Sequence, residues 1–471
     1  MDLYVILTTL FGYGMFALAG VAVFSVVCWG GYWIYKHIFH GTARLRVSQW
    51  IVLFLLFGWF FLVLGITTFS RGANFTGEIN LSLFSSYVNA WNQWSYSEFQ
   101  LIIFNMLMFS PLGFLLPYLT ERGKRFSFVC LISFVTTLAI EILQFVSGRG
   151  IFELDDLFHN FIGSIFGYFI SSFLVACIQK KIFAWKFFAR ALVLPGIYSI
   201  GFIAALAVYH HQPFGNMPIL PVQKQDMSAV SIQNDAELLE QDGKASVYQN
   251  ANADNLQYSQ TLRSALEELT GTQFKSGAHD NGNNKLFVSK NSNTQLTIFS
   301  NNSGWDYTTW EEDTIQLDQV TVKKKQQQIE AWLKKYRLLP ESAVCSVQDD
   351  FILRWDVPPV DPTTCPKDFV SGSLLVQFNS QSDISSISYF VIYNKYIDSF
   401  DIQSEKEAYG KILEGNFQQY VPFEQGDLLF VENCTLDYVY DTKGFFRPVY
   451  RFSGYVNNPN QFWEASVDAM A

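Results

Sequence analysis

The sequence predicts a polytopic α-helical membrane domain of six transmembrane helices, followed by a C-terminal extracytoplasmic α+β domain. Six long apolar runs occupy residues 1–210, and residues 211–471 have an ordinary soluble composition. Residues 1–210 carry 12 Lys/Arg and 8 Asp/Glu, a net charge of +4, whereas residues 211–471 carry 20 and 34, a net charge of −14. The mean hydropathy of +0.13 therefore averages two unlike halves. An apolar content of 49% also excludes a disordered chain.

Each apolar run is long enough to cross a bilayer, whose core of about 30 Å needs roughly 20 residues of helix. The first run has no basic segment before it and no small-residue cleavage site, so we expect it to be retained rather than removed as a signal peptide. Pro111 and Pro195 lie inside two runs, which membrane helices tolerate when neighbouring groups satisfy the freed carbonyls. The runs lie within Leu3–Tyr35 and at Gln49–Phe69, Phe99–Leu119, Phe126–Val146, Leu157–Ile178 and Phe187–Tyr209.

Basic residues in the short loops predict the orientation of the helices. Of the 12 Lys/Arg in residues 1–210, only Arg71 and Arg149 lie in the second and fourth loops. We therefore expect loops one, three and five in the cytoplasm, with the N-terminus and the C-terminal domain outside the cell membrane. The residues in the expected cytoplasmic loops are Lys36, Arg44, Arg46, Arg122, Lys124, Arg125, Lys180, Lys181, Lys186 and Arg190.

Polar residues are dense around the fourth loop, at the expected external face. Glu141 lies inside the fourth run, and Gln144 shares its helix face three residues later. Burying an ionisable residue at membrane depth costs free energy, so Glu141 is a candidate for a functional site. Arg149 is the expected partner of its carboxylate. The candidate functional residues are Asn105, Glu141, Gln144, Arg149, Asp155, Asp156 and Asn160.

The same residues also have structural interpretations, which the sequence leaves open. Asp155 or Asp156 could cap the N-terminus of the fifth helix. Asn105 and Gln144 could hydrogen-bond neighbouring helices. Glu141 could belong to a structural ion pair.

The order and spacing of these residues resemble the VanZ-like membrane proteins across residues 50–176. The resemblance implies a bacterial cell-envelope protein of a kind common in Gram-positive bacteria, whose founding members are associated with resistance to the glycopeptide antibiotic teicoplanin. It points to the same seven candidate residues, and Ser110 departs from an otherwise apolar family position. The matching motifs are residues 80–84, Asn105-Met-Leu-Met-Phe-Ser-Pro-Leu-Gly-Phe-Leu-Leu-Pro117, Glu141-Ile-Leu-Gln144, Gly148-Arg149, Leu154-Asp-Asp-Leu-Phe-His-Asn160, Gly163 and Gly167.

Beyond a linker at 211–235, residues 236–471 predict an α+β domain, divided into two lobes near residue 340. Helical periodicity is expected at 258–269, 320–336 and 404–414. Residues 405–452 resemble extracytoplasmic regulatory domains of the YycH/YycI or PepSY-like type, which implies binding of an envelope protein partner. Strands are expected at 285–288, 295–299, 350–355, 372–378, 386–393, 428–440 and 447–455.

The cysteines divide between the two halves of the chain. Cys28, Cys130 and Cys177 lie in or beside the apolar runs, where we expect apolar packing. Three cysteines lie in the predicted extracytoplasmic domain, and two of them, Cys345 and Cys365, are candidates for a disulfide across a strand pair.

Taken together, these features favour a non-enzymatic envelope protein that binds an amphiphilic or glycopeptide ligand at the membrane. No cofactor or metal site is expected, because no Gly-rich phosphate loop or zinc motif occurs. Nucleic acid is excluded as a partner because the acidic half has no basic stripe. The alternatives are an enzyme at the membrane surface acting on lipid or cell-wall precursor, or a proton-coupled transporter; both would use Glu141, Asp155 and Asp156.

Overall fold

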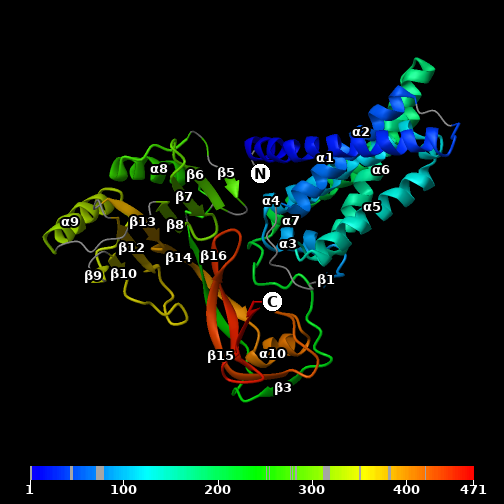
Figure 1. The fold of residues 1–471 in the computed structure, drawn as a ribbon. Helices are drawn as coiled ribbons and strands as arrows, with labels where there is room; N and C mark the ends of the chain where they lie inside the picture. The colour runs from blue at the N-terminus through cyan, green and yellow to red at the C-terminus, as the bar shows by residue number, and fades with distance from the viewer. Residues whose placement is uncertain are drawn as a thin grey trace. The chain divides into compact units, whose positions relative to one another are not determined.

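The computed structural model describes residues 3–42, 46–69, 79–250, 252–253, 255–275, 277, 279–281, 284–310, 319–348, 352–379, 383–419 and 421–470. Arg44 and Arg71, which contributed to the predicted orientation, lie outside the described residues. The chain divides into two compact units (Figure 1). The first comprises Met1–Tyr87 and Glu98–His211, and the second comprises Val88–Ser97 and Gln212–Ala471.

The first unit is helical, and within its described residues six helices are long and apolar enough to cross a membrane. Each corresponds to one predicted run, which confirms a multi-pass membrane protein. A short π-helix, η1 (Gly65–Phe69), continues the second of these helices, and α3 (Ser85–Asn92) and η2 (Arg122–Lys124) lie in the connections. The long helices are α1 (Leu3–His37), α2 (Val47–Leu64), α4 (Tyr96–Leu119), α5 (Phe126–Val146), α6 (Leu154–Lys180) and α7 (Trp185–His211).

Helices α4 and α6 approach closely through glycines. A Cβ added at Gly163 or Gly167 would collide with the carbonyl oxygens of Met106 and Ser110 on α4. Gly113 makes the reciprocal approach from α4 to the backbone of α6. Small residues at such a contact let helix backbones pack tightly in a membrane. The Gly-x-x-x-Gly step therefore fixes the distance between the two helices that carry several candidate residues.

Ser110 explains how α4 accommodates a proline. Pro111 has no N–H to offer the carbonyl of Leu107, four residues earlier. The Ser110 hydroxyl donates to that carbonyl oxygen at 2.8 Å instead. Ser110 thus satisfies the carbonyl group that the proline frees.

The second unit contains two sheets, of which the first is eight-stranded and antiparallel, with order β5-β6-β7-β8-β13-β12-β10-β9. Helices α8 (Leu256–Thr270) and α9 (Gln319–Lys335) lie side by side against it (Figure 1), joined by a hydrogen bond of 2.9 Å from Trp332 Nε1 to the Ala265 carbonyl. In the core, the rings of Trp305 and Tyr389 stack with centroids 5.0 Å apart. The strands are His279–Asn281, Asn284–Val288, Thr294–Phe299, Trp305–Thr309, Ile384–Tyr389, Ser373–Phe378, Ile352–Asp356 and Val344–Gln348, in that spatial order.

The second sheet is seven-stranded, with order β11-β14-β4-β16-β15-β3 and with β17 paired to β16. Helix α10 (Glu405–Leu413) packs Ala408 and Ile412 into the core of this sheet, beside Phe452. Strands β15 and β16 form a long antiparallel hairpin, at the two segments 428–440 and 447–455 where strands were expected. The strands, in the same spatial order, are Phe369–Ser371, Ile392–Ile402, Gly243–Asn250, Phe445–Val456, Leu428–Tyr440 and Ser231–Asn234, with Phe462–Asp468 as β17.

The sheets do not divide the chain near residue 340. Strand β8 pairs with β13, so one sheet contains strands from both sides of that position. Strand β4 precedes the eight-stranded sheet in sequence but belongs to the seven-stranded one, where it pairs with β14 and β16. Strand β3 also lies within the expected linker and pairs in parallel with β15. Long-range pairing, which local patterns do not encode, accounts for these differences.

Cys345 and Cys365, the candidates for a disulfide, are both free thiols in the structure. Cys345 lies on β9, where Trp355 is its cross-strand neighbour. Cys365 lies in the loop after β10, and its carbonyl accepts a hydrogen bond of 2.5 Å from the hydroxyl of Tyr248 on the other sheet. The two cysteines therefore belong to different structural neighbourhoods.

The segment after α7 is fixed inside the second unit around Asp441. This carboxylate is fully buried and accepts hydrogen bonds from the backbone N–H groups of Gly215, Lys443 and Phe445 at 2.6, 2.8 and 3.0 Å. Burial raises the pKa of Asp441, although those N–H groups act in the opposite direction.

A second set of hydrogen bonds joins this segment to residues 88–97. The Asn216 side chain donates to the carbonyl of Trp91 at 2.5 Å, and the Asn92 side chain donates to the carbonyl of Leu220 at 3.2 Å. The backbone N–H of Asn216 also donates to the Thr442 hydroxyl at 2.8 Å. Three distant stretches of chain are thus tied together within one unit.

Candidate functional site

Asp155 holds the start of α3 rather than the start of its own helix. The short parallel strands β1 (Ile79–Asn80) and β2 (Phe152–Glu153) align the two segments. One carboxylate oxygen accepts from the Phe84 N–H at 2.5 Å, and the other accepts from the Ser86 N–H at 2.7 Å and the Ser85 hydroxyl at 3.1 Å. The residue is 1% exposed. Asp155 is therefore an N-cap supplied from a neighbouring helix.

His159, one turn after Asp155, continues this contact between α6 and α3. Its Nε2 lies 3.0 Å from the Tyr87 hydroxyl, which lies 2.7 Å from the Tyr198 hydroxyl of α7. Burial and the bond to Tyr198 raise the pKa of Tyr87, so its hydroxyl keeps its proton. His159 is not among the seven residues predicted from the sequence, although its i,i+4 spacing from Asp155 places both side chains on one helix face.

A second i,i+4 pair on α6, Asp156 and Asn160, connects this helix to α4 and α5. Asn105 Nδ2 on α4 donates to Asp156 Oδ1 at 2.7 Å. Asn160 Nδ2 donates to the Thr137 hydroxyl on α5 at 3.0 Å. The first of these contacts agrees with the structural interpretation of Asn105, in which its side chain hydrogen-bonds a neighbouring helix.

Glu141 and Gln144 share the buried face of α5, at 1% and 3% exposure. Gln144 Nε2 donates to the Thr67 carbonyl at 3.4 Å, in the π-helical turn that ends the second span. The Arg149 guanidinium lies over the Phe69 ring, 5.8 Å from its centre. Helix α5 thus contributes a buried carboxylate and amide to the same membrane unit.

The first turns of α6 hydrogen-bond to α3, α4 and α5. We call the polar side chains that α4, α5 and α6 contribute here the polar cluster: Asn105, Glu141, Gln144, Asp155, Asp156, His159 and Asn160. Two buried atoms of this cluster, His159 Nδ1 and Asn160 Oδ1, have no hydrogen-bond partner among the described residues. Buried polar atoms are normally satisfied, so an unmet pair indicates a place for a water molecule or a polar ligand group.

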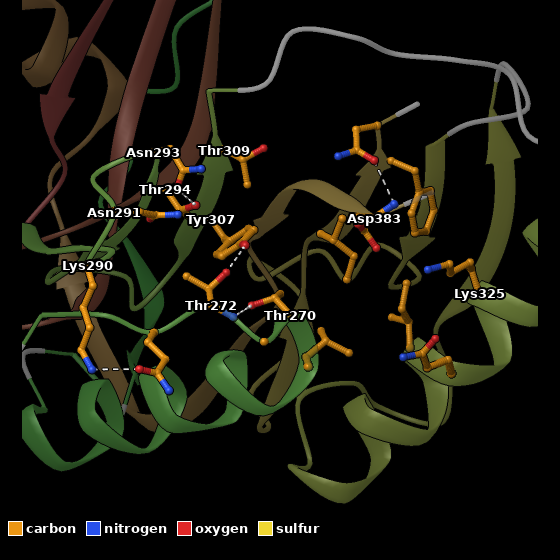
Figure 2. A pocket seen from close by; sticks show the side chains of 18 residues that line it. Thr270, Thr272, Lys290, Asn291, Asn293, Thr294, Tyr307, Thr309, Lys325 and Asp383 are labelled. Carbon is orange, nitrogen blue, oxygen red and sulfur yellow. Dashed lines mark hydrogen bonds between the residues drawn. The ribbon is translucent and has the colours of Figure 1, made fainter. Parts of the chain in front are cut away.

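The second unit contains a separate candidate, a polar hollow of about 570 Å³ (Figure 2). Hydroxyl and amide groups dominate its wall, and the Thr272 and Tyr307 hydroxyls lie 2.9 Å apart. Lys290 Nζ donates to the Gln273 side chain at 2.8 Å, and Asp383 contributes an acidic group on the opposite side. Such a wall suits a neutral, hydroxyl-rich ligand. No sequence motif indicated this hollow, because its residues come from five separate segments.

Metal binding finds no support in the part of the chain that the structure describes. No three His, Cys, Asp or Glu side chains there lie close enough to hold a metal ion. Asp155 and Asp156 instead accept hydrogen bonds from N–H and O–H donors. The arrangement therefore resembles a structural polar core more than an ion site.

Comparison with known proteins identifies one part of the chain. Residues 50–176 match the VanZ/LLP1 family model, so this segment is a VanZ-like domain and the predicted resemblance is confirmed. The matched residues extend from α2 into α6 and include all seven predicted site residues.

The other comparisons add little. An uncharacterized protein of known crystal structure from Eubacterium rectale ATCC 33656 is similar over 52% of this chain and 89% of its own, with 11% identity. The TM-score of 0.24 is too low to support an argument about fold or function. No curated protein matches the sequence. The resemblance of residues 405–452 to YycH/YycI or PepSY-like modules finds no support in these comparisons.

Proposed function

We propose that this VanZ-like membrane protein is a non-enzymatic envelope protein that binds an amphiphilic ligand at the polar cluster, and that teicoplanin is such a ligand. Binding would sequester the antibiotic at the membrane and lower the susceptibility of the cell. The observation that carries the proposal is the unmet hydrogen-bonding capacity of His159 Nδ1 and Asn160 Oδ1. Both atoms lie on the first turns of α6, beside helices that expose apolar side chains to lipid.

The contacts of the acidic residues favour binding over catalysis. Both oxygens of Asp155 accept hydrogen bonds from the N-terminus of α3, and Asp156 accepts one from Asn105. The N–H donors of a helix N-terminus stabilise the charged form of the carboxylate that caps it. Such a carboxylate is therefore poorly suited to transfer protons. This geometry argues against an enzyme or a proton-coupled transporter built on Asp155 and Asp156.

The proposal also includes the predicted orientation, with the polar cluster, the N-terminus and the second unit outside the cell. Residues 236–471 would then meet an envelope protein partner. A membrane-impermeant maleimide should label Ser228→Cys but not Glu121→Cys in intact cells, when both are made in a chain whose own cysteines are replaced by serine. The reverse pattern would invert the orientation.

Susceptibility to teicoplanin tests the function. Expression of the intact chain should raise the inhibitory concentration several-fold, and Glu141→Gln and Asn160→Leu should remove the increase. Glu121→Gln is the matched control, since it makes the same change at an acid that is 87% exposed. No increase with the intact chain, at verified membrane abundance, would refute the proposal.

A second measurement separates binding from reaction. The antibiotic and the lipid fraction can be recovered from membranes that contain the intact chain and analysed by mass spectrometry. Unchanged masses support binding alone. A new product that depends on Glu141 would replace the proposal with an enzymatic one.

A further inference from the structure

A hollow of about 700 Å³ lies at the other end of the membrane helices, where the basic residues gather. It is formed by the start of α2, the end of α4, η2, the last turns of α6 and the start of α7. These are helix ends, so the hollow lies at the level where lipid headgroups meet the protein. Its wall is rich in polar groups, among them Arg46, Gln49, Glu121, Lys124, Tyr168 and Ser171.

The charge around this hollow is strongly positive. The described residues in 36–42, 46–48, 119–126 and 179–190 include nine Lys/Arg and one Asp/Glu, which is Glu121. Such a field concentrates anions, and basic pockets between membrane helices are suited to anionic headgroups. Glu121 is paired with Lys124 at 2.7 Å, but both side chains are exposed, so this ion pair contributes little and an anion can compete for Lys124.

The wall of the hollow is held in place by hydrogen bonds. Gln49 Nε2 donates to the Leu119 carbonyl at 2.8 Å, which joins α2 to the end of α4. The Tyr168 hydroxyl donates to the Lys124 carbonyl at 3.0 Å, which joins α6 to η2. The positions of the two cationic segments are therefore set before any ligand arrives.

Ser171 supplies an independent indication of a ligand. Its side chain is fully buried on α6, lines the hollow, and its hydroxyl has no hydrogen-bond partner in the described structure. A buried donor of this kind costs free energy unless something accepts its proton. An anionic oxygen between Ser171 and the basic side chains would satisfy it.

We propose that this hollow binds an anionic phosphate group, with Arg46 and Lys124 as its cationic contacts and Ser171 as a hydroxyl donor. The phosphate can come from a phospholipid headgroup or from free phosphate. Apolar side chains of Pro117, Val175 and Phe187 line the same hollow and would contact the first carbons of a lipid. The site is distinct from the polar cluster, and the inference does not depend on the proposed antibiotic ligand.

Lipid retention by the purified full chain tests this site. The protein is placed in phosphatidylcholine nanodiscs with or without phosphatidylglycerol, and the bound lipid is counted by native mass spectrometry. Each Lys or Arg near an anionic surface contributes about fivefold to affinity, so Arg46→Gln with Lys124→Gln should weaken phosphatidylglycerol retention by roughly 25-fold. Ser171→Ala should weaken it in the same direction.

The matched control pair is Lys181→Gln with Arg190→Gln, which removes the same charge at the same end but outside the wall of the hollow. Because Lys181 and Arg190 do not line the hollow, this pair should cause a clearly smaller loss than the Arg46/Lys124 pair. Equal losses in the two pairs, or equal retention of the two lipids by the intact chain, would overturn the lipid site. If millimolar inorganic phosphate raises the melting temperature of the intact chain but not of the Arg46/Lys124 pair, free phosphate is the ligand; no effect in any arm overturns the proposal.

Discussion

Asp155 is the residue for which the structure gives the sharpest quantitative prediction. Its carboxylate is buried and receives three donors from the first residues of α3, at 2.5, 2.7 and 3.1 Å. Asp155→Ala removes all three acceptor contacts and leaves two part-buried backbone N–H groups and one buried hydroxyl without this acceptor. We therefore expect the substitution to destabilise the protein through the loss of a cap, whatever the ligand.

The magnitude follows from the contacts. A buried donor that loses its partner costs about 1–3 kcal/mol, and loss of an N-cap alone costs about 0.5–2 kcal/mol. Two part-buried N–H groups and one buried hydroxyl, each near the lower end of that range, give a total of about 3–5 kcal/mol for Asp155→Ala. Asp155→Asn keeps one acceptor oxygen but turns an NH₂ group toward a backbone N–H, so about 2–3 kcal/mol is expected. Asp156→Asn preserves the oxygen that accepts from Asn105 and should cost under about 1 kcal/mol.

The assay is thermal unfolding of the full chain in detergent, followed by fluorescence-detected size-exclusion chromatography. At about 2–4 °C per kcal/mol, Asp155→Ala should melt roughly 10 °C below the wild type, with Asp155→Asn between the two. Asp156→Asn serves as the neighbouring acidic control. A melting temperature for Asp155→Ala close to that of Asp156→Asn would refute the role of Asp155 as a cap.

Three further predictions concern packing, thiol chemistry and pH. Gly167→Ala places a methyl group against the Ser110 carbonyl and should lower the melting temperature by several degrees; an unchanged value would mean that α4 and α6 are not in close contact. Burial raises the pKa of Cys345 to about 11 and of Cys434 to about 12, so iodoacetamide at pH 8 should alkylate Cys345 about 200-fold and Cys434 about 2,000-fold more slowly than unfolded thiols; mass spectrometry without reductant should find both free, and a disulfide would contradict the structure. The folded-state pKa of Asp441 is raised above its unfolded value, so folding binds protons and stability falls as pH rises through the raised pKa; the difference in melting temperature between wild type and Asp441→Asn should show this slope, and a difference that changes in the opposite direction would contradict it.

The helices of the membrane unit could be predicted from the sequence because length and apolar content alone specify a span. The ends of α5 agree with the predicted run at both residues, Phe126 and Val146. The strands of the second unit also follow their alternation, as in β7 (Thr294–Phe299), where buried and half-buried residues alternate strictly. These are local signals, and they do not identify the partner of a strand. The place of β4 beside β14 could not be predicted for that reason.

The candidate site was predictable as a set of residues but not as a set of contacts. The cost of burying Glu141 or Asp155 in a membrane made both conspicuous in the sequence. Which group satisfies each one depends on the fold: Asp155 bonds to a helix about 70 residues earlier, through Phe84 and Ser86. The two hollows could not be predicted from the sequence, because their walls combine residues from separate segments that form no motif.

The hydrogen bonds around Asn216 have a consequence for biosynthesis. Trp91 and Asn92 are synthesised before the last four spans, whereas their partners Asn216 and Leu220 are made after all six spans. The hairpin that carries Thr442 is complete only near the end of translation. Trp91 and Asn92 therefore remain without these contacts while the last four spans are made. A chain shortened before residue 441 would keep both of these bonds but lose the acceptors that Asp441 and Thr442 offer to Gly215 and Asn216.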